Sequence, residues 1–363
     1  MATTLAPLDA AIWTRIQSGQ SVDLARMLDG FNEAGEPRVQ VAVETVFTDG
    51  SHPFDVLRPT GMWSDERSQS GEVEALRLTD DDGEWLLLAI ATQSDGVFHL
   101  AAAGPRTASR WQRVERWIGR TRDISKCFIN HKDLAGIGDE LAAYGRVEVV
   151  KVAARVARDG SSINRGFPVR DGFERPSHTD EIHEIEQLGA SIRTLTLHVV
   201  DSVDVHLRRI AGATFNGGSF RVFRDVVLRR LEDAAAVRRQ LVSDRARLPG
   251  SERVESLTVS LGASILEDAD DTGDLLAVVG AMPDFSMAVF HRNPYLHFAV
   301  TDEVDGSNFD VMVTRADAVD IFPGYRASAA SLARVSQRIG EAFGALTIAN
   351  ARLEEPTSIF ELR

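Results

Sequence analysis

The feature that most constrains this fold is a series of short segments in which apolar and polar residues alternate, joined by tight turns. Residues 39–47 alternate with the period of two that half-buried strands show. Residues 73–78 and 85–91 flank a run of three aspartates followed by Gly83, and the strand, Asp-Gly turn and strand around Gly96 resemble those around Gly306. Glycine accepts the positive φ that hairpin turns require. The pattern therefore predicts antiparallel meanders in the first and last thirds of the chain.

Helical patterns accompany both meanders. Trp111, Val114 and Trp117 fall on one side of a helix predicted over residues 107–120, and arginines occupy the other sides. Residues 328–343 carry a comparable apolar stripe. Further helices are predicted within residues 7–29 and 275–282. We therefore expect two related units that combine a meander with packing helices, over residues 1–120 and 251–363.

The middle of the chain has a different pattern. A predicted strand at 127–129, a helix over 132–144 and a continuous apolar strand over 147–156 follow one another, which is typical of a parallel pair buried on both faces. A basic, glycine-rich loop is expected over 158–176, and a long basic helix over 220–247. The predicted class is α+β, with two antiparallel-meander units flanking a central mixed α/β segment over residues 121–250.

Length and composition agree with a multidomain globular protein. A chain of 363 residues exceeds the ~250–300 residues at which a single hydrophobic core stops growing. The sequence has no apolar run near the ~20 residues that span a bilayer, and its N-terminal residues do not resemble a secretion signal. Its one cysteine, Cys127, excludes an internal disulfide and is expected to be a small buried apolar residue. We expect a soluble, cytoplasmic protein with no membrane partner.

The charges are unevenly distributed. The formal net charge is −14, and only three of the 40 basic residues are lysines, which is typical of a bacterium with a GC-rich genome. Residues 106–170 nevertheless contain 14 basic and 7 acidic residues, and residues 208–247 contain 10 basic and 4 acidic residues. These segments therefore carry 14 − 7 = +7 and 10 − 4 = +6. Such segregation predicts a positive central surface on an acidic protein.

A positive surface of this kind is suited to phosphate groups, provided that its arginines converge on one face. Tryptophans alternate with the first arginines, although at helical spacing they are expected to pack in the core. The residues predicted to contact nucleic acid or phosphate are Arg110, Arg113, Arg116, Arg120, Lys151, Arg155, Arg158, Arg165, Arg221, Arg224, Arg229, Arg230, Gly217 and Gly218.

The two glycines are included because Asn216-Gly217-Gly218-Ser219 precedes the long helix and would present backbone N–H groups to a phosphate. The segment lacks the lysine of a P-loop, and a tight turn is the competing interpretation. His198 and His206 are weak catalytic candidates. If their hairpin closes around Ser202, the two rings face each other across the strands.

No metal site or cofactor is expected. The densest cluster of possible ligands spans residues 178–186, but His178 and His183 are five residues apart and do not share a helix face. An acidic solvated helix is the preferred interpretation of that segment.

These patterns predict a non-enzymatic binding or adaptor subunit of a larger bacterial assembly. A protein is the expected partner, and nucleic acid is a possible second one through the basic central surface. The alternative is a phosphodiester- or nucleotide-processing enzyme that uses the Gly217-Gly218 turn and the His198/His206 pair. The oligomeric state is left open.

Overall fold

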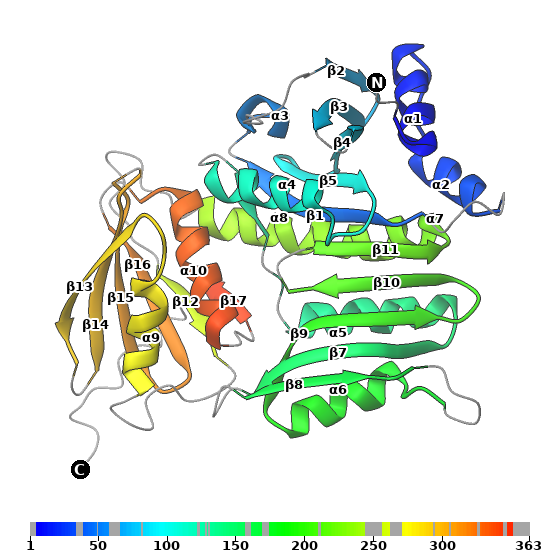
Figure 1. Cartoon of the computed structure of the whole chain (residues 1–363). Helices are drawn as coiled ribbons and strands as arrows, with labels where there is room; N and C mark the ends of the chain where they lie inside the picture. The colour runs from blue at the N-terminus through cyan, green and yellow to red at the C-terminus, as the bar shows by residue number, and fades with distance from the viewer. Residues whose placement is uncertain are drawn as a thin grey trace. The chain divides into compact units, whose positions relative to one another are not determined.

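The computed structural model describes residues 5–33, 39–48, 50–57, 66–80, 83–121, 124–127, 129, 131–156, 161–168, 174–209, 212–243, 256–261, 271–292, 295–304, 306–324, 327–343 and 347–350. The chain forms two compact units, Met1–Arg239 and Gln240–Arg363 (Figure 1). Both consist of helices packed on antiparallel sheets, so the predicted α+β class is confirmed. No helix in the described part of the chain is long and apolar enough to cross a membrane.

The first unit is built on an 11-stranded sheet. Its strands, in spatial order, are β2 (Glu66–Ser70), β3 (Val73–Asp80), β4 (Gly83–Ala91), β5 (Val97–Ala103), β1 (Val41–Thr48), β11 (Gly212–Gly218), β10 (Val203–Arg208), β9 (Ala190–Val199), β7 (Val147–Val156) and β8 (Ser162–Gly166), with β6 (Ile124–Lys126) paired to β1. Strand β1 lies between β5 and β11, so the sheet continues through the boundary that was expected near residue 120. Residues on both sides of that boundary therefore belong to one unit.

The parallel strand pair predicted in the middle of the chain is wrong. Strand β6 runs antiparallel to β1, and β7 runs antiparallel to both β8 and β9. Strand β8 lies within the segment that was expected to be a loop. The apolar run of β7 therefore belongs to an antiparallel strand, and its pairing with β9 shifts register after Val149 and again after Ala153.

Helices lie on both faces of this sheet (Figure 1). They are α1 (Pro7–Gln17), α2 (Leu24–Glu33), α3 (Pro53–Val56), α4 (Ser109–Arg120), α5 (His131–Leu141) with the 3₁₀ turn η1 (Ala142–Tyr144), α6 (His178–Gln187), and the continuous series α7 (Phe220–Val222), η2 (Phe223–Leu228) and α8 (Arg229–Ser243). The segment η2 is a π-helix.

The register of β1 defines the two faces. Ala42 packs with Trp111 and Val114 of α4, and we call this side of the sheet the α4 face. Val41, its neighbour in sequence, pairs with Phe215 on β11. The Phe215 ring contacts the Phe220 ring on the opposite side, with ring centroids 5.1 Å apart. Because side chains alternate along a strand, α4 and the α7–α8 series lie on opposite faces, and we call the second the α8 face.

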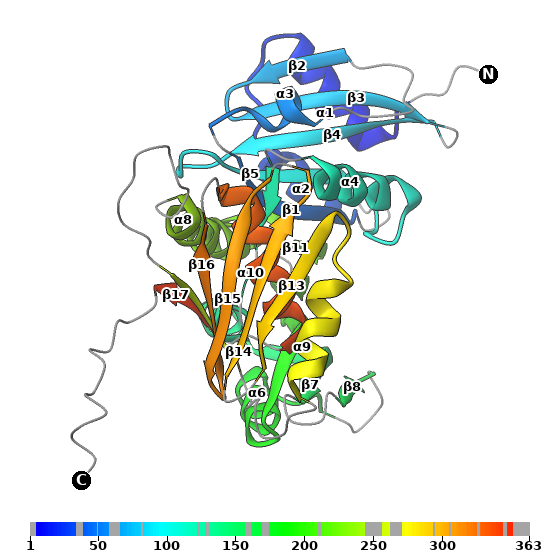
Figure 2. The same ribbon diagram turned by 90° about the vertical axis from the view of Figure 1, so that its left-hand side faces the viewer.

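The second unit contains a 6-stranded antiparallel sheet and two helices. Its elements are β13 (Phe285–His291), β14 (Leu296–Asp302), β15 (Asn308–Arg315), β16 (Ala318–Pro323), β12 (Leu257–Ser260), β17 (Thr347–Asn350), α9 (Asp271–Gly280) and α10 (Ala329–Phe343). In Figure 2 the strands β13 to β16 lie in front of α10. Asp302 is fully buried and accepts hydrogen bonds from the Ser331 hydroxyl, at 2.7 Å, and from the Arg334 guanidinium. These bonds fasten α10 to β14.

Candidate functional site

The predicted arginine sets do not form one surface. Arg110, Arg113 and Arg116 belong to α4, whereas Arg224 and Arg229 belong to the helices of the opposite face. The main chain of Arg120 belongs to α4, and Arg158 lies outside the described residues. The sheet itself separates the two sets, so a single groove cannot contain both.

Five of these arginines already have acidic partners. Arg110 and Arg113 both approach the buried carboxylate of Asp80, at 3.4 and 3.5 Å. On the other side of the sheet, Arg224 is 2.8 Å from Asp225. Arg230 pairs with Glu140, and Arg165 lies 2.7 Å from Glu184 and 3.2 Å from Glu181. Much of the segregated positive charge is therefore neutralised within the fold.

The predicted phosphate loop ends a strand and does not form a cradle. Gly217 and Gly218 are the last residues of β11 and have φ values of 141° and 86°. A side chain at Gly218 would collide with the carbonyl oxygen of Ser202. The Phe220 N–H donates to the Asp29 carboxylate at 2.5 Å, and the Ser219 hydroxyl accepts from Val222. Asp29 thus occupies the position at the start of the helix that an anion would take.

The expected pairing of His198 with His206 is wrong. The hairpin turns around Asp201, which has a φ of 57°, and not around Ser202. His198 consequently lies opposite Asp204, with 2.5 Å between its Nδ1 and the carboxylate, and His206 lies opposite Thr196. The two imidazoles occupy the same face but different rows, so they do not form a proton-transfer pair.

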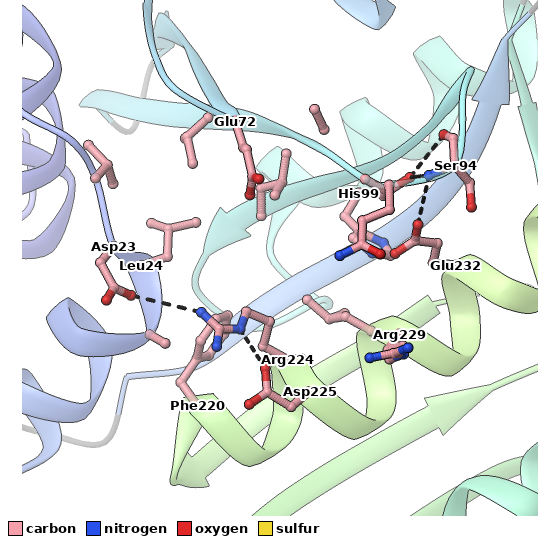
Figure 3. Close-up of a pocket in the computed structure, with 18 of the residues that line it drawn as sticks. Asp23, Leu24, Glu72, Ser94, His99, Phe220, Arg224, Asp225, Arg229 and Glu232 are labelled. Carbon is pink, nitrogen blue, oxygen red and sulfur yellow. Dashed lines mark hydrogen bonds and ion pairs between the residues drawn. The ribbon is translucent and has the colours of Figure 1, made fainter.

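A groove of about 550 Å³ opens on the α8 face, between α2, η2 and the ends of β3 and β4 (Figure 3). This volume lies within the range of pockets that bind small molecules. The π-helical turn contributes Arg224, Asp225 and Leu228 to one wall. π-Helical turns occur frequently at functional sites. The lining residues are Val22, Asp23, Leu24, Ala25, Glu72, Val73, Ile90, Ala91, Thr92, Gln93, Ser94, His99, Phe220, Arg224, Asp225, Leu228, Arg229, Glu232 and Asp233.

The groove is acidic and apolar at once. Five carboxylates and two guanidiniums line it, together with eight apolar residues, which gives a formal charge of 2 − 5 = −3. Arg224 is directed toward Asp225, at 2.8 Å, and toward Asp23, at 4.0 Å (Figure 3). Glu72 and Asp233 are exposed at the groove. Its negative charge is therefore available to a ligand.

His99 lies at the inner end of the groove, near Glu232 (Figure 3). Its Nδ1 is 3.0 Å from the Thr45 hydroxyl on β1. Burial lowers the pKa of His99 to about 4, and the charge of Glu232 offsets this effect only in part. His99 is therefore a neutral, hydrogen-bonded residue at neutral pH.

Other candidate groups are structural. Cys127 is fully buried, and burial raises the pKa of its thiol to about 12. The prediction that it is a small buried apolar residue is confirmed. The buried His131 ring accepts the Ile192 N–H at 3.3 Å and lies 3.0 Å from Glu186, which ties α5 to β9 and α6. Among the described residues, no group of three His, Cys, Asp or Glu side chains is placed to hold a metal ion.

Comparison with known proteins adds little. No protein-family model and no curated protein matches the sequence. Among solved structures, a bacteriophytochrome, RpBphP3 from the photosynthetic bacterium R. palustris, aligns over 74% of this chain and 82% of its own, with 12% identity and a TM-score of 0.13. A score this low carries no argument about fold or function.

Sequence analysis missed the groove, because its walls come from distant parts of the chain. Asp23 and Arg224 meet although they are about two hundred residues apart in sequence. Two local features of the sequence could have indicated this groove. One is the pair of acids Glu232 and Asp233 within an otherwise basic helix, and the other is His99 in an apolar strand.

Proposed function

We propose that this chain is a non-enzymatic binding protein that holds a cationic segment of a partner protein in the α2–η2 groove. The observation that carries the proposal is the formal charge of −3 on a groove that also has apolar walls. Lysine and arginine side chains combine an aliphatic stem with a cationic head. The apolar residues of the groove suit the stem, and Glu72 and Asp233 suit the head.

A binding role is favoured over catalysis by the condition of the polar groups. His99 is neutral and is hydrogen-bonded to Thr45, and the Cys127 thiol is inaccessible. A general base or nucleophile needs a lone pair or thiolate that reaches the substrate. The enzyme alternative also loses the pairing of His198 and His206 on which it depended. We therefore retain the adaptor interpretation and assign its contact site to the groove.

Protein is favoured over nucleic acid as the partner for an electrostatic reason. Five of the arginines predicted to contact phosphate are paired with Asp80, Asp225, Glu140 and Glu184. A nucleic acid would have to displace these carboxylates. A cytoplasmic bacterial assembly remains part of the proposal, supported by a single cysteine and by the preference for arginine over lysine.

The test is binding of a fluorescein-labelled hexapeptide that contains two arginines, followed by anisotropy. The proposal expects the neutral and the diglutamate versions of the same peptide to bind more weakly. Equal binding of all three peptides would refute a cation-selective groove.

A further inference from the structure

A second polar site lies on the α4 face, beyond the part that α4 covers. Lys151 on β7 pairs with Thr196 on β9, Thr196 with His206 on β10, and His206 with Thr214 on β11. Paired residues on adjacent strands bring their Cβ atoms to about 5 Å. The four side chains therefore form one row across four strands.

The row is open to ligands over most of its length. Lys151 is exposed, and Thr196 and His206 are half-buried. Their neighbours in sequence, such as Leu195 and Leu207, are fully buried on the opposite face. In Figure 1 the helix α5 runs alongside strands β9 and β10, where it covers that opposite face.

Three cations act on the His206 ring. Burial, then the charges of Arg208, Arg106 and Lys151, lower the pKa of His206 to about 4. Arg208 follows His206 by two residues and so shares its face. Arg106 reaches across Gly212, where any side chain would collide with its guanidinium.

The acidic residues near this row already have basic partners. Glu44 and Glu115 both bind Arg106, and Glu115 lies 3.5 Å from Arg208. In the next row, Asp204 is bound to His198 at 2.5 Å. Glu148 there is paired with Arg146 and lies 3.7 Å from Arg175. Lys151 makes no ion pair with any residue that the structure describes.

Hydrogen-bond donors accompany these charges. The Thr196 hydroxyl lies 2.8 Å from the Nδ1 atom of His206. The Thr214 hydroxyl is buried at the far end of the row and has no hydrogen-bond partner within the described structure. An ammonium, a guanidinium, hydroxyls and an imidazole at this spacing are the donors that tetrahedral oxyanions prefer.

We propose that Lys151, Thr196, His206 and Arg208 form a binding subsite for a small oxyanion, of the size and charge of a phosphate group. The subsite is on the face opposite the acidic groove and does not depend on the function proposed for the groove. A bound anion would sit against the row, with Lys151 and Arg208 on its two sides. It would also favour the protonated form of His206, because it offsets the three cations.

The experiment is an NMR titration of the full chain with inorganic phosphate at pH 7 and constant ionic strength, with His206 assigned through His206→Gln. The proposal predicts saturable shifts of the His206 ring signals, and a His206 pKa that rises when phosphate is present. Acetate and sulfate titrations distinguish a carboxylate site from a site for tetrahedral anions. Absence of His206 shifts at 50 mM phosphate overturns the proposal. A charge pair with hydroxyl donors is expected to give a Kd no weaker than roughly 50 mM.

Matched lysine variants provide the control. Lys151→Met removes the exposed cation of the row, whereas Lys132→Met removes an exposed lysine from α5. We expect Lys151→Met to weaken phosphate binding by about 5- to 10-fold, in line with one charge-assisted contact. Lys132→Met should leave it unchanged. Equal weakening by both variants would show that phosphate responds only to overall charge, which would contradict the subsite.

Discussion

Glu232 on α8 accepts a hydrogen bond from the backbone N–H of Ser94, at 2.9 Å and across 138 residues of sequence. The bond joins the helix that forms one wall of the groove to the turn between β4 and β5, which forms its inner end. The hydrogen-bond acceptor and the negative charge of Glu232 can be separated by substitution. Glu232→Gln keeps an oxygen acceptor and removes the charge, whereas Glu232→Ala removes both.

We predict that Glu232→Ala lowers the free energy of unfolding by about 1 kcal/mol, because it leaves the Ser94 N–H without its acceptor. Glu232→Gln should cost less than half of that. Both variants should weaken binding of a cationic peptide to a similar degree. Urea unfolding and peptide anisotropy on the same samples check this; equal stability of the two variants would show that the hydrogen bond contributes little.

Two glycines on α5 should respond oppositely to alanine. A methyl group at Gly138 would overlap the buried His178 ring of α6, whereas nothing lies within 4 Å of the corresponding position at Gly136. We expect Gly138→Ala to lower the free energy of unfolding by about 1–3 kcal/mol through overpacking. Gly136→Ala should raise it by up to about 1 kcal/mol, because alanine favours helix. Thermal and urea unfolding of both variants check this prediction. Similar changes in stability for the two variants would contradict it and would show that α6 moves freely away from α5.

The buried Asp9 carboxyl should lower the free energy of unfolding at neutral pH. Burial raises the pKa of this carboxyl from 3.8 to about 6, against the smaller effect of the Leu86 N–H that it accepts. The folded state therefore binds the proton more tightly than the unfolded state, and the stability that this provides is fully present below about pH 4 and is lost as the pH rises to about 6. We predict that Asp9→Asn raises the free energy of unfolding by about 3 kcal/mol at pH 7 and by about half of that at pH 5.

The measurement is urea unfolding of both proteins at the two pH values. A gain that does not shrink between pH 7 and pH 5 would show that ionisation of Asp9 is not its cause.

His99 should act in the opposite direction. Its pKa falls from 6.5 to about 4 on folding because of burial, so between these values the unfolded state takes up a proton that the folded state does not. The contribution of His99 is fully present above pH 6.5 and is lost as the pH falls toward 4, with about 2 kcal/mol lost by pH 5.

The comparison is with His99→Asn, which does not titrate. We expect its urea midpoint to vary less than that of the natural chain between pH 7 and pH 5. Parallel pH profiles for the two proteins would mean that His99 is protonated in the folded state or accessible to solvent.

Much of the local structure follows from sequence patterns. Strand β7 matches the predicted range 147–156, because a run of apolar and β-branched residues has few alternatives to a buried strand. The β3–β4 hairpin forms where Gly83 permits the turn, with a φ of 117°. Such features depend on residues that are close together in the sequence, so local sequence patterns are enough to predict them.

The register of each strand pair and the choice of strand partners were harder to predict from the sequence. The β9–β10 hairpin centres on Asp201 and not on Ser202, because aspartate tolerates the left-handed conformation that this turn requires. That displacement was enough to place His198 opposite Asp204. Strand β11 was missed entirely, since Gly217 and Gly218 indicated a loop before a helix. Its pairing with β1 joins segments about 170 residues apart, and no local pattern encodes that choice.

The most direct test of the central claim compares two double variants in their affinity for the diarginine hexapeptide. Glu72→Gln/Asp233→Asn removes two exposed charges from the groove. Asp201→Asn/Asp317→Asn removes two exposed charges elsewhere, and asparagine tolerates the positive φ at position 201. The control is needed because a net charge of −14 attracts any cation. We predict that the groove variant binds at least about 5-fold more weakly, equivalent to about 1 kcal/mol, and that the control binds like the natural chain. Equal affinities for the two variants would contradict the assignment of the groove as the binding site.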